Sequence, residues 1–368
     1  MFSIWFFQSL AYPRRISFTI LSMKTPQIVP ETLAKFPFFG ILNPIDLEWI
    51  LHQSTSENCQ PGRVLIQEGK PVESLYLSLS GTLAVTVSRQ DGGEQELKRL
   101  FAGELMGEMS FLDNHLPSAT IKVVEDSQVL SLSKTTLAHK LEIDGDFASR
   151  FYHLLSLKLS DQLRGLSGLL TENQALPSEP LRKVLLVFAV LNDSDIAWMI
   201  ANGVPEKVIP NTVLIQQGKP VPAVYILLEG TLGIYISLTK NGITTEKEVA
   251  KSIKGEILGE MSFVEIGTAS ATVKVVENAW LLALPQSQLA AKLEADRPFA
   301  SRFYRAIAVV LSNRWRDRLM RRGFATLAND LTSILSEEID AEDELDFDVL
   351  EGTAIAGTRF DWMIRQLR

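Results

Sequence analysis

The sequence contains one long internal repeat. Residues 64–87 (VLIQEGKPVESLYLSLSGTLAVTV) and 213–236 (VLIQQGKPVPAVYILLEGTLGIYI) are identical at 13 of 24 aligned positions, at an offset of 149 residues. Residues 107–125 match residues 259–277 at 12 of 19 positions, at an offset of 152 residues. A period of about 150 residues is the size of a whole domain and far exceeds a solenoid repeat. The chain is therefore predicted to contain two copies of one domain, with three residues inserted in the second copy.

Each copy has a strand-rich centre between helices. In residues 75–80 apolar and polar side chains alternate, and the alternation resumes after Gly81, which is typical of half-buried antiparallel strands. Asp91-Gly92-Gly93 and Asn241-Gly242 have the composition of hairpin turns.

Helices are predicted on both sides of these strands. Residues 42–49 and 191–198 each begin a short helix. Asn43 is well placed to cap the first, and Asn192 or Ser194 the second. Apolar residues recur at helical spacing after the second copy, at Phe299, Phe303, Ile307, Val310 and Leu311.

The charge is distributed unevenly. The net charge of −8 equals the charge of the eight acidic residues between Glu337 and Asp348, so the rest of the chain is neutral overall. This run disfavours nucleic acid as a partner, because it would repel a phosphate backbone. The basic residues that end the last helix are interpreted as a solvated helix end, with a membrane or partner contact as the alternative; they are Arg314, Arg316, Arg318, Arg321 and Arg322.

Catalytic patterns are absent from the sequence. The four histidines have no metal-ligand spacing, and no Gly-x-Ser-x-Gly, Walker or Gly-x-Gly-x-x-Gly sequence occurs. The single cysteine, Cys59, can form neither an internal disulfide nor a Cys-based metal site. We therefore expect no enzyme activity, no catalytic residues, no metal and no cofactor, and a cytoplasmic location.

The most specific sequence feature is a glycine-led cassette in each copy. Gly107-Glu108-Met109-Ser110-Phe111 leads to Pro117-Ser118-Ala119-Thr120-Ile121, and Gly259-Glu260-Met261-Ser262-Phe263 leads to Ala269-Ser270-Ala271-Thr272-Val273. A glycine that opens a helix brings backbone N–H groups close to a compact anion such as a cyclic phosphate. The cassette is therefore a candidate binding site for a small anionic ligand.

Over residues 33–165 and 181–319 the sequence resembles the cyclic-nucleotide-binding domain family, as in regulatory subunits of cyclic-AMP-dependent kinase and bacterial catabolite activators. The resemblance implies a mainly β fold with flanking α-helices, made of two tandem double-stranded β-helix (jelly-roll-like) domains. It implies cAMP or cGMP as ligand, with the carboxylates of Glu108 and Glu260 accepting a hydrogen bond from the ribose 2′-hydroxyl. The implied ligand-binding residues are Gly107, Glu108, Met109, Ser110, Ser118, Ala119 and Thr120, and Gly259, Glu260, Met261, Ser262, Ser270, Ala271 and Thr272.

One residue of the family cassette is missing from both copies. The arginine that pairs with the phosphate is replaced by Pro117 in the first copy and by Ala269 in the second. The loss of a charge-assisted hydrogen bond, worth about 1.5–3 kcal/mol, predicts roughly ten- to hundredfold weaker binding of a cyclic phosphate. His115 could bring partial positive charge to the first loop, but Gly267 occupies the corresponding position in the second.

The predicted domain boundaries follow from the repeat. They are an N-terminal extension over residues 1–30, domains over 31–168 and 181–322, and an acidic C-terminal tail with short helices over 323–368. Residues 1–22 begin with an apolar, aromatic stretch that would suit peripheral membrane contact, or they precede a true start at Met23. Arg14-Arg15-Ile16-Ser17-Phe18 is similar to the segment by which kinase regulatory subunits occupy a catalytic cleft.

The sequence thus predicts a non-enzymatic regulatory protein. Ligand occupancy of a β-roll would move the following helix, residues 147–165 or 299–322, and change the contact with a protein partner that the sequence does not identify. One alternative is a scaffold whose rolls keep their shape without a ligand. The other is a transcription regulator, which is disfavoured because no helix-turn-helix follows the second copy.

Overall fold

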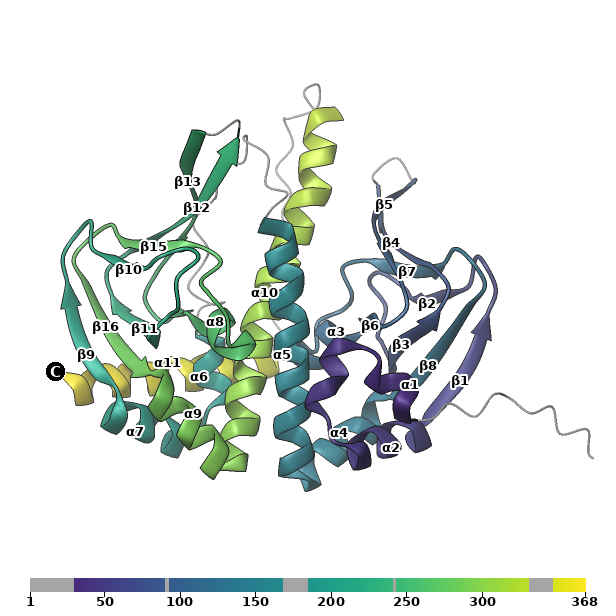
Figure 1. The fold of residues 1–368 in the computed structure, drawn as a ribbon, viewed down its shortest axis with the longest axis horizontal. Coiled ribbons are helices and arrows are strands. Elements are labelled where there is room, and N and C mark those ends of the chain that lie inside the picture. Colours follow the sequence, from purple (N-terminus) through teal and green to yellow (C-terminus); the bar gives the residue numbers. More distant parts are fainter. Residues whose placement is uncertain (1–29, 90–92, 168–184, 241–242, 331–346) are drawn as a thin grey trace, which may run out of the picture.

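The computed structural model describes residues 30–89, 93–167, 185–240, 243–330 and 347–368. These residues form two repeats of one architecture, placed on either side of a central pair of long helices (Figure 1). The predicted turn residues 91, 92, 241 and 242, the Arg14–Phe18 segment and acidic residues 337–346 lie outside the described residues.

Repeat 1 consists of helices before and after a roll of eight strands. Its helices are α1 (Pro30–Ala34), the 3-10 helix η1 (Pro37–Ile41), α2 (Pro44–Gln53), α3 (Glu108–Asp113), α4 (Lys134–Ile143) and α5 (Gly145–Ser167). Its strands are β1 (Ser54–Cys59), β2 (Val64–Ile66), β3 (Ser74–Ser80), β4 (Leu83–Ser88), β5 (Glu94–Leu100), β6 (Leu105–Met106), β7 (Thr120–Val123) and β8 (Ser127–Ser133). They form two antiparallel sheets, in the orders β1-β8-β3-β6 and β2-β7-β4-β5.

Repeat 2 has the same order of elements. Its helices are α6 (Leu186–Val190), α7 (Asp193–Asn202), α8 (Glu260–Glu265), α9 (Gln286–Ala295) and α10 (Arg297–Asp330), and α11 (Phe347–Leu367) follows. Its strands are β9 (Val204–Val208), β10 (Val213–Ile215), β11 (Ala223–Glu229), β12 (Leu232–Lys240), β13 (Ile243–Ser252), β14 (Ile257–Leu258), β15 (Thr272–Val275) and β16 (Ala279–Pro285). The sheets are again antiparallel and four-stranded, in the orders β14-β11-β16-β9 and β10-β15-β12-β13.

The prediction of a mainly β, jelly-roll-like fold with flanking helices is confirmed. Gly81, where the alternating pattern breaks, has a φ of +89°, and a Cβ atom there would lie 2.1 Å from the Oγ of Ser127. Any other residue would be strained by the positive φ and would clash with Ser127 through its Cβ atom, so glycine is required at this turn. The inserted residues of the second copy extend the β12–β13 hairpin, whose strands have 9 and 10 residues where β4 and β5 have 6 and 7.

The predicted caps are present and tie the first helices to the last. Asn43 caps α2 in a capping box with Asp46, and the same Asp46 carboxylate accepts two hydrogen bonds from Arg150 on α5, at 2.6 and 3.0 Å. Asn192 and Asp195 repeat this arrangement on α7, with Arg302 on α10. A bidentate arginine–carboxylate pair restricts geometry more than a single contact does, so the helix before each roll is held against the long helix after it.

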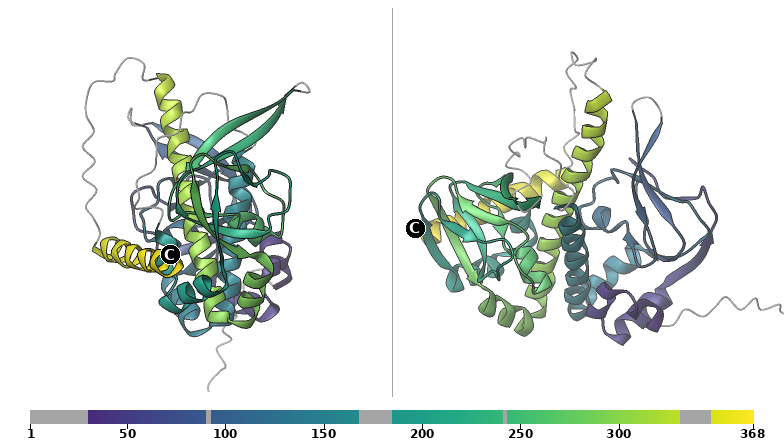
Figure 2. Two further views of the ribbon diagram at one scale, coloured as in Figure 1. Left: turned by 90° about the vertical axis from the view of Figure 1, so that its left-hand side faces the viewer. Right: turned by 45° about the horizontal axis from the view of Figure 1, so that its top comes forward.

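The two long helices, α5 and α10, run parallel to each other between the rolls (Figure 2). Their first turns meet at an ion pair between Arg297 and Asp146, 3.4 Å long. Further along, the rings of His153 and Tyr304 stack at 4.2 Å. The helical pattern predicted after the second copy is confirmed, because Phe299, Phe303, Ile307 and Leu311 are fully buried in α10. A single apolar core joins the helices of both repeats.

Helix α11 adds a second contact on repeat 2. Phe360 packs edge-on against Phe188 of α6 at 5.1 Å between ring centroids, and Arg359 donates to the carbonyl of Phe188 at 3.0 Å. Within the described residues, no helix has both the length and the apolar character that crossing a membrane requires.

His153 is a titratable group enclosed in the contact between the repeats. Its Nε2 lies 3.2 Å from the carbonyl oxygen of Val264 in repeat 2. Burial lowers the pKa of His153, and the Val264 carbonyl only partly opposes this. Burial also raises the pKa of the stacked Tyr304 to about 12. Both rings are therefore neutral in the folded protein at pH 7.

We expect the free energy of unfolding to fall as the pH drops below about 6.5. The reason is that His153 takes up a proton in the unfolded chain before it does so in the folded one. Urea denaturation at pH 7 and pH 5 measures this effect, and His153→Phe should reduce the difference between the two pH values. His139→Gln, at an exposed position on α4, is the matched control and should leave the difference unchanged. An equal pH dependence in His153→Phe and the wild type would contradict the prediction.

Candidate functional site

Six of the predicted ligand-binding residues of repeat 1 line one cavity. Gly107 opens α3 with a φ of +86°, and a Cβ atom there would lie 3.0 Å from the carbonyl oxygen of Ser74. This tight turn sets the first turn of α3 against the interior of the roll. The cavity has a volume of about 100 Å³. The predicted residues that line it are Gly107, Glu108, Met109, Ser110, Ser118 and Ala119, with Pro117 beside them.

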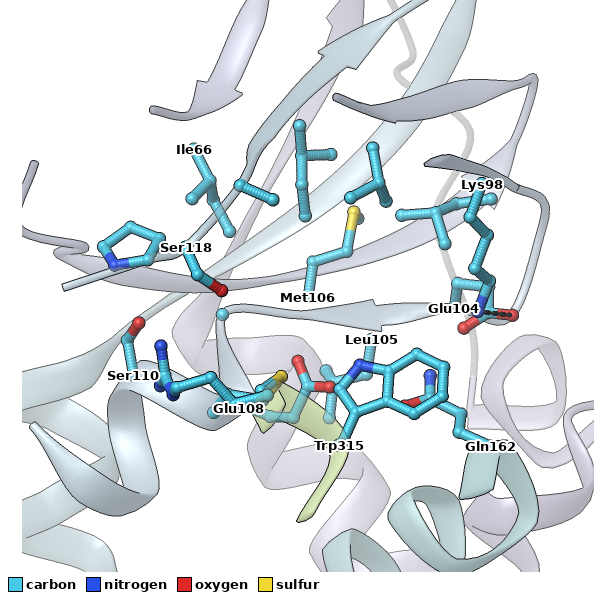
Figure 3. A pocket seen from close by; sticks show the side chains of 18 of the residues that line it. Ile66, Lys98, Glu104, Leu105, Met106, Glu108, Ser110, Ser118, Gln162 and Trp315 are labelled. Carbon is cyan, nitrogen blue, oxygen red and sulfur yellow. Dashed lines mark ion pairs between the residues drawn. The ribbon is translucent and has the colours of Figure 1, made fainter. Parts of the chain in front are cut away.

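The cavity lies between the roll and the long helices. Ile66 and Met106 form an apolar wall on the roll side, and Trp315 of α10 lies opposite them next to Glu108 (Figure 3). Gln162 of α5 lies beside Trp315, and Ser110 and Ser118 are at the other end of the cavity. Elements from both repeats therefore build this site.

Trp315 closes the cavity from the second repeat. It is 7% exposed, and Lys98 of β5 lies 5.8 Å from its ring centroid in a cation–π contact. Glu104 is 3.8 Å from the same ammonium group. Burial lowers the pKa of Lys98, although Glu104 opposes the shift. This wall was not identified from the sequence, because no local pattern shows that Trp315, in the second repeat, meets the cassette of the first.

The cassette carboxylates form ion pairs with the long helices. Glu108 pairs with Lys158 of α5, and both side chains are at least 93% buried. Glu260 pairs with Arg314 of α10, which also donates to the carbonyl of Ile257 at 2.9 Å. The carboxylates that the family resemblance assigns to a ribose hydroxyl are thus already engaged. A ligand hydroxyl would have to share Glu108 with Lys158.

Thr120 and Thr272 have a structural role in both repeats. The Oγ1 of Thr120 accepts a hydrogen bond from the backbone N–H of Glu68, and that of Thr272 accepts one from Gln217, each at 3.1 Å. Neither threonine lines the cavity. Each instead fixes the loop that follows β2 or β10 to the strand after the cassette.

The cassette of repeat 2 has the same backbone, and its roll has a larger cluster of buried apolar residues. Gly259 opens α8 with a φ of +82°, and Glu260, Met261 and Ser262 form the first turn. Ala269 and Thr272 are both 5% exposed, and Ser270 and Ala271 are half-buried. Thirteen buried apolar residues form the core of this roll, against seven in repeat 1. None of the predicted residues of repeat 2 lines the cavity described above.

Two reciprocal arginine contacts join each long helix to the cassette of the other repeat. Arg316 of α10 donates to both carboxylate oxygens of Asp113, at 3.1 and 3.0 Å, and to the carbonyl of Leu116 at 3.1 Å. Arg164 of α5 pairs with Glu265 and donates to the carbonyl of Thr268 at 3.0 Å. Arg164 and Arg316 are 152 residues apart, as are Asp113 and Glu265. The two contacts are therefore equivalent in the internal repeat.

These contacts correct the interpretation of the basic cluster. Arg314 and Arg316 do not form a solvated helix end, because their side chains are 29% and 14% exposed and paired with acids. The side chains of Arg318, Arg321 and Arg322 lie outside the described part of the structure. The sequence could not reveal the pairing, since Asp113 and Arg316 are 203 residues apart.

Asp113 is ionised within this contact. Burial alone would raise the pKa of Asp113. Hydrogen bonds from His115 and the positive charge of the Arg316 guanidinium outweigh burial, so the pKa is lowered. His115 itself is half exposed, lies 3.5 Å from the Asp113 carboxylate and does not line the cavity. His115 therefore interacts with the carboxylate that Arg316 binds and is not part of the cavity wall. Among the side chains described, no group of three or more His, Cys, Asp or Glu is arranged to hold a metal ion.

The comparisons with known proteins agree with this architecture. Residues 56–144 and 205–296 both match the family model for the cyclic nucleotide-binding domain. Each match lies within one repeat and includes its cassette. The chain therefore contains two domains of the cyclic nucleotide-binding family.

Sequence relatives cover only parts of the chain. The cAMP-activated global transcriptional regulator CRP of Pasteurella multocida is 28% identical over 33% of this chain and 59% of its own length. Patatin-like phospholipase domain-containing protein 6 of Pongo abelii is 28% identical over 30% of this chain and 8% of its own length. The cGMP-dependent protein kinase of Toxoplasma gondii is 23% identical over 62% of this chain and 20% of its own length. The matches thus span less than two thirds of these relatives.

Two solved structures extend the comparison. The regulatory domain of Toxoplasma gondii PKA with cAMP is 18% identical, covering 78% of this chain and 95% of that one, with a TM-score of 0.29. The sensor domain of the transcriptional regulator DNR from Pseudomonas aeruginosa is 21% identical, covering 40% and 95%, with a TM-score of 0.31.

We expect Arg316→Met to lower the free energy of unfolding by about 2–4 kcal/mol, because it leaves the buried carboxylate of Asp113 without its cation. Arg164→Met should cost less, about 1–2 kcal/mol, because Glu265 and Arg164 are more exposed and water compensates part of the loss. Urea denaturation monitored by circular dichroism measures both. Arg63→Met, which removes an exposed ion pair with Glu57, is the control and should change stability by less than about 1 kcal/mol. Equal losses in Arg63→Met and Arg316→Met would contradict the assignment.

Proposed function

We propose that the chain is a non-enzymatic regulatory protein in which repeat 1 binds a small ligand of the cyclic-nucleotide type and α10 of repeat 2 responds to its occupancy. The observation that carries the proposal is the cavity between the repeat 1 cassette and Trp315. The family of both domains supports it. The cassette supplies backbone donors and serines on one side, and the indole supplies a flat apolar surface on the other.

The size of the cavity links binding to movement. Pockets for drug-sized ligands usually measure about 300–1,000 Å³, whereas this cavity measures about 100 Å³. A nucleotide-sized ligand would therefore have to displace Trp315 or the cassette. Trp315 lies between Arg314 and Arg316, which hold Glu260 and Asp113. Displacement of the indole would consequently strain the contacts that join α10 to both cassettes.

The pair between Glu108 and Lys158 gives the ligand a second way to act. A ligand hydroxyl that hydrogen-bonds to Glu108 would weaken the hold of this carboxylate on α5. Because both side chains are buried, the Lys158 ammonium group would need new compensation. Ligand binding would then bias the positions of α5 and α10 together, and a protein partner that contacts these helices would sense the change.

Repeat 2 acts as a scaffold in this proposal. Its roll has the larger apolar core, and its cassette carboxylate is held by Arg314. The second repeat thus supplies the helix that closes the site of the first.

A ligand-free scaffold role for the whole chain is the second candidate function, favoured by the ion pairing of both Glu108 and Glu260. A cytoplasmic location, action without DNA and membrane contact through residues 1–22 stay predictions.

Calorimetric titration of the full chain with cAMP and cGMP tests the proposal. We expect saturable binding that Ala119→Leu weakens at least about tenfold, because the added side chain fills the cavity. Ala271→Leu makes the matched change in repeat 2, and we expect it to leave the affinity within about twofold. Circular dichroism checks that both variants fold. Absence of binding by the wild type at millimolar ligand would overturn the proposal, and selective loss in Ala271→Leu would move the site to repeat 2.

A further inference from the structure

The charged groups at the repeat 1 cavity neutralise one another. Three cations line it, namely Lys98, Lys158 and Arg316. Each has its own carboxylate, since Lys98 is 3.8 Å from Glu104, Lys158 pairs with Glu108, and Arg316 is 3.0 Å from Asp113. Pro117 takes the position where a cassette arginine would add a further charge, and it has no side-chain donor. The cavity therefore has no uncompensated positive charge for a phosphate.

Burial makes this balance costly to break. The side chains of Lys158, Glu108 and Asp113 are 4%, 7% and 3% exposed. An anion that took the ammonium of Lys158 as its partner would leave the Glu108 carboxylate buried and unpaired. An anion that left the pairs intact would itself be buried without a counter-charge. Both outcomes carry a large desolvation penalty.

Two polar atoms at the cavity lack a hydrogen bond. Among the described residues, neither the Oε1 of Gln162 nor the Nε of Arg316 has a hydrogen-bond partner, although both atoms are shielded from solvent. Both residues line the cavity, and Gln162 lies beside the Trp315 ring (Figure 3). The amide oxygen requires a donor and the guanidinium N–H an acceptor. A ligand that carries both donors and acceptors around its ring could satisfy them.

We infer that the repeat 1 cavity selects an uncharged heterocyclic ligand of nucleobase or nucleoside type over its phosphorylated form. A purine carries donors and acceptors around its ring, such as N6–H and N7 of adenine. Its flat face could stack on the Trp315 indole, once that side chain or the cassette has moved to enlarge the cavity. This inference rests on the proposed function, because it concerns the same cavity. It ranks the uncharged nucleoside ahead of the anionic cyclic phosphate that the family resemblance implies.

Calorimetric titration of the full chain with adenosine, guanosine, cAMP and cGMP tests the inference. We expect each nucleoside to bind at least about tenfold more tightly than its own cyclic phosphate, with Ala119→Leu weakening nucleoside binding. A cyclic phosphate that binds as tightly as its nucleoside, or more tightly, would overturn the inference and leave the proposed function intact. Absence of binding by all four compounds would overturn both.

Glu108→Gln tests the charge argument directly. This change leaves the Lys158 ammonium group without its carboxylate, so the cavity gains one unpaired positive charge. We expect the affinity for cAMP to rise at least about tenfold relative to that for adenosine. The matched control is Asp193→Asn, which removes the exposed partner of Arg359, and it should leave the ratio unchanged. An unchanged ratio in a folded Glu108→Gln protein would show that charge pairing does not set the preference.

Discussion

The parallel packing of α5 against α10 is the constraint on which the rest of the structure depends. Each helix packs apolar side chains into the shared core. Each also directs charged side chains towards the cassettes. Once the helices lie side by side, each cassette meets two of them. Its own long helix supplies a cation to the glutamate at the start of the short cassette helix, and the other repeat's long helix supplies an arginine at its end. A change in either helix therefore reaches both rolls.

The cassette glutamates form ion pairs at the positions where the family resemblance implies ligand acceptors. In the resemblance to cyclic-nucleotide-binding domains they are ligand acceptors, whereas here they anchor Lys158 and Arg314. A buried ion pair contributes less to stability than its Coulomb energy suggests, because desolvation offsets most of the attraction. It does, however, penalise any arrangement in which one partner is lost. That property favours a switch between two discrete states over gradual movement.

Much of the fold could be predicted from the sequence, since the repeat, the alternating strands, the Asn43 and Asn192 caps and the apolar spacing of α10 are all local patterns. The tight turn at Gly107 that opens α3 could also be predicted, because a glycine followed by a short helix is a local motif. Trp315, Arg316 and Lys158 also line the cavity, and the sequence alone did not place them there. Their roles depend on how the second repeat docks on the first, and docking is decided by side chains hundreds of residues apart.

Joining both repeats in one chain has a consequence for how the two halves can differ. In a dimer of identical subunits every substitution appears twice, so the two subunits could not carry different residues at corresponding positions. Here the position that corresponds to Trp315 in α5 is Leu163, and the position that corresponds to Lys158 in α10 is Val310. Two copies of one domain in a single chain can therefore carry different residues at equivalent positions of their long helices, so the surroundings of the two cassettes differ within one molecule.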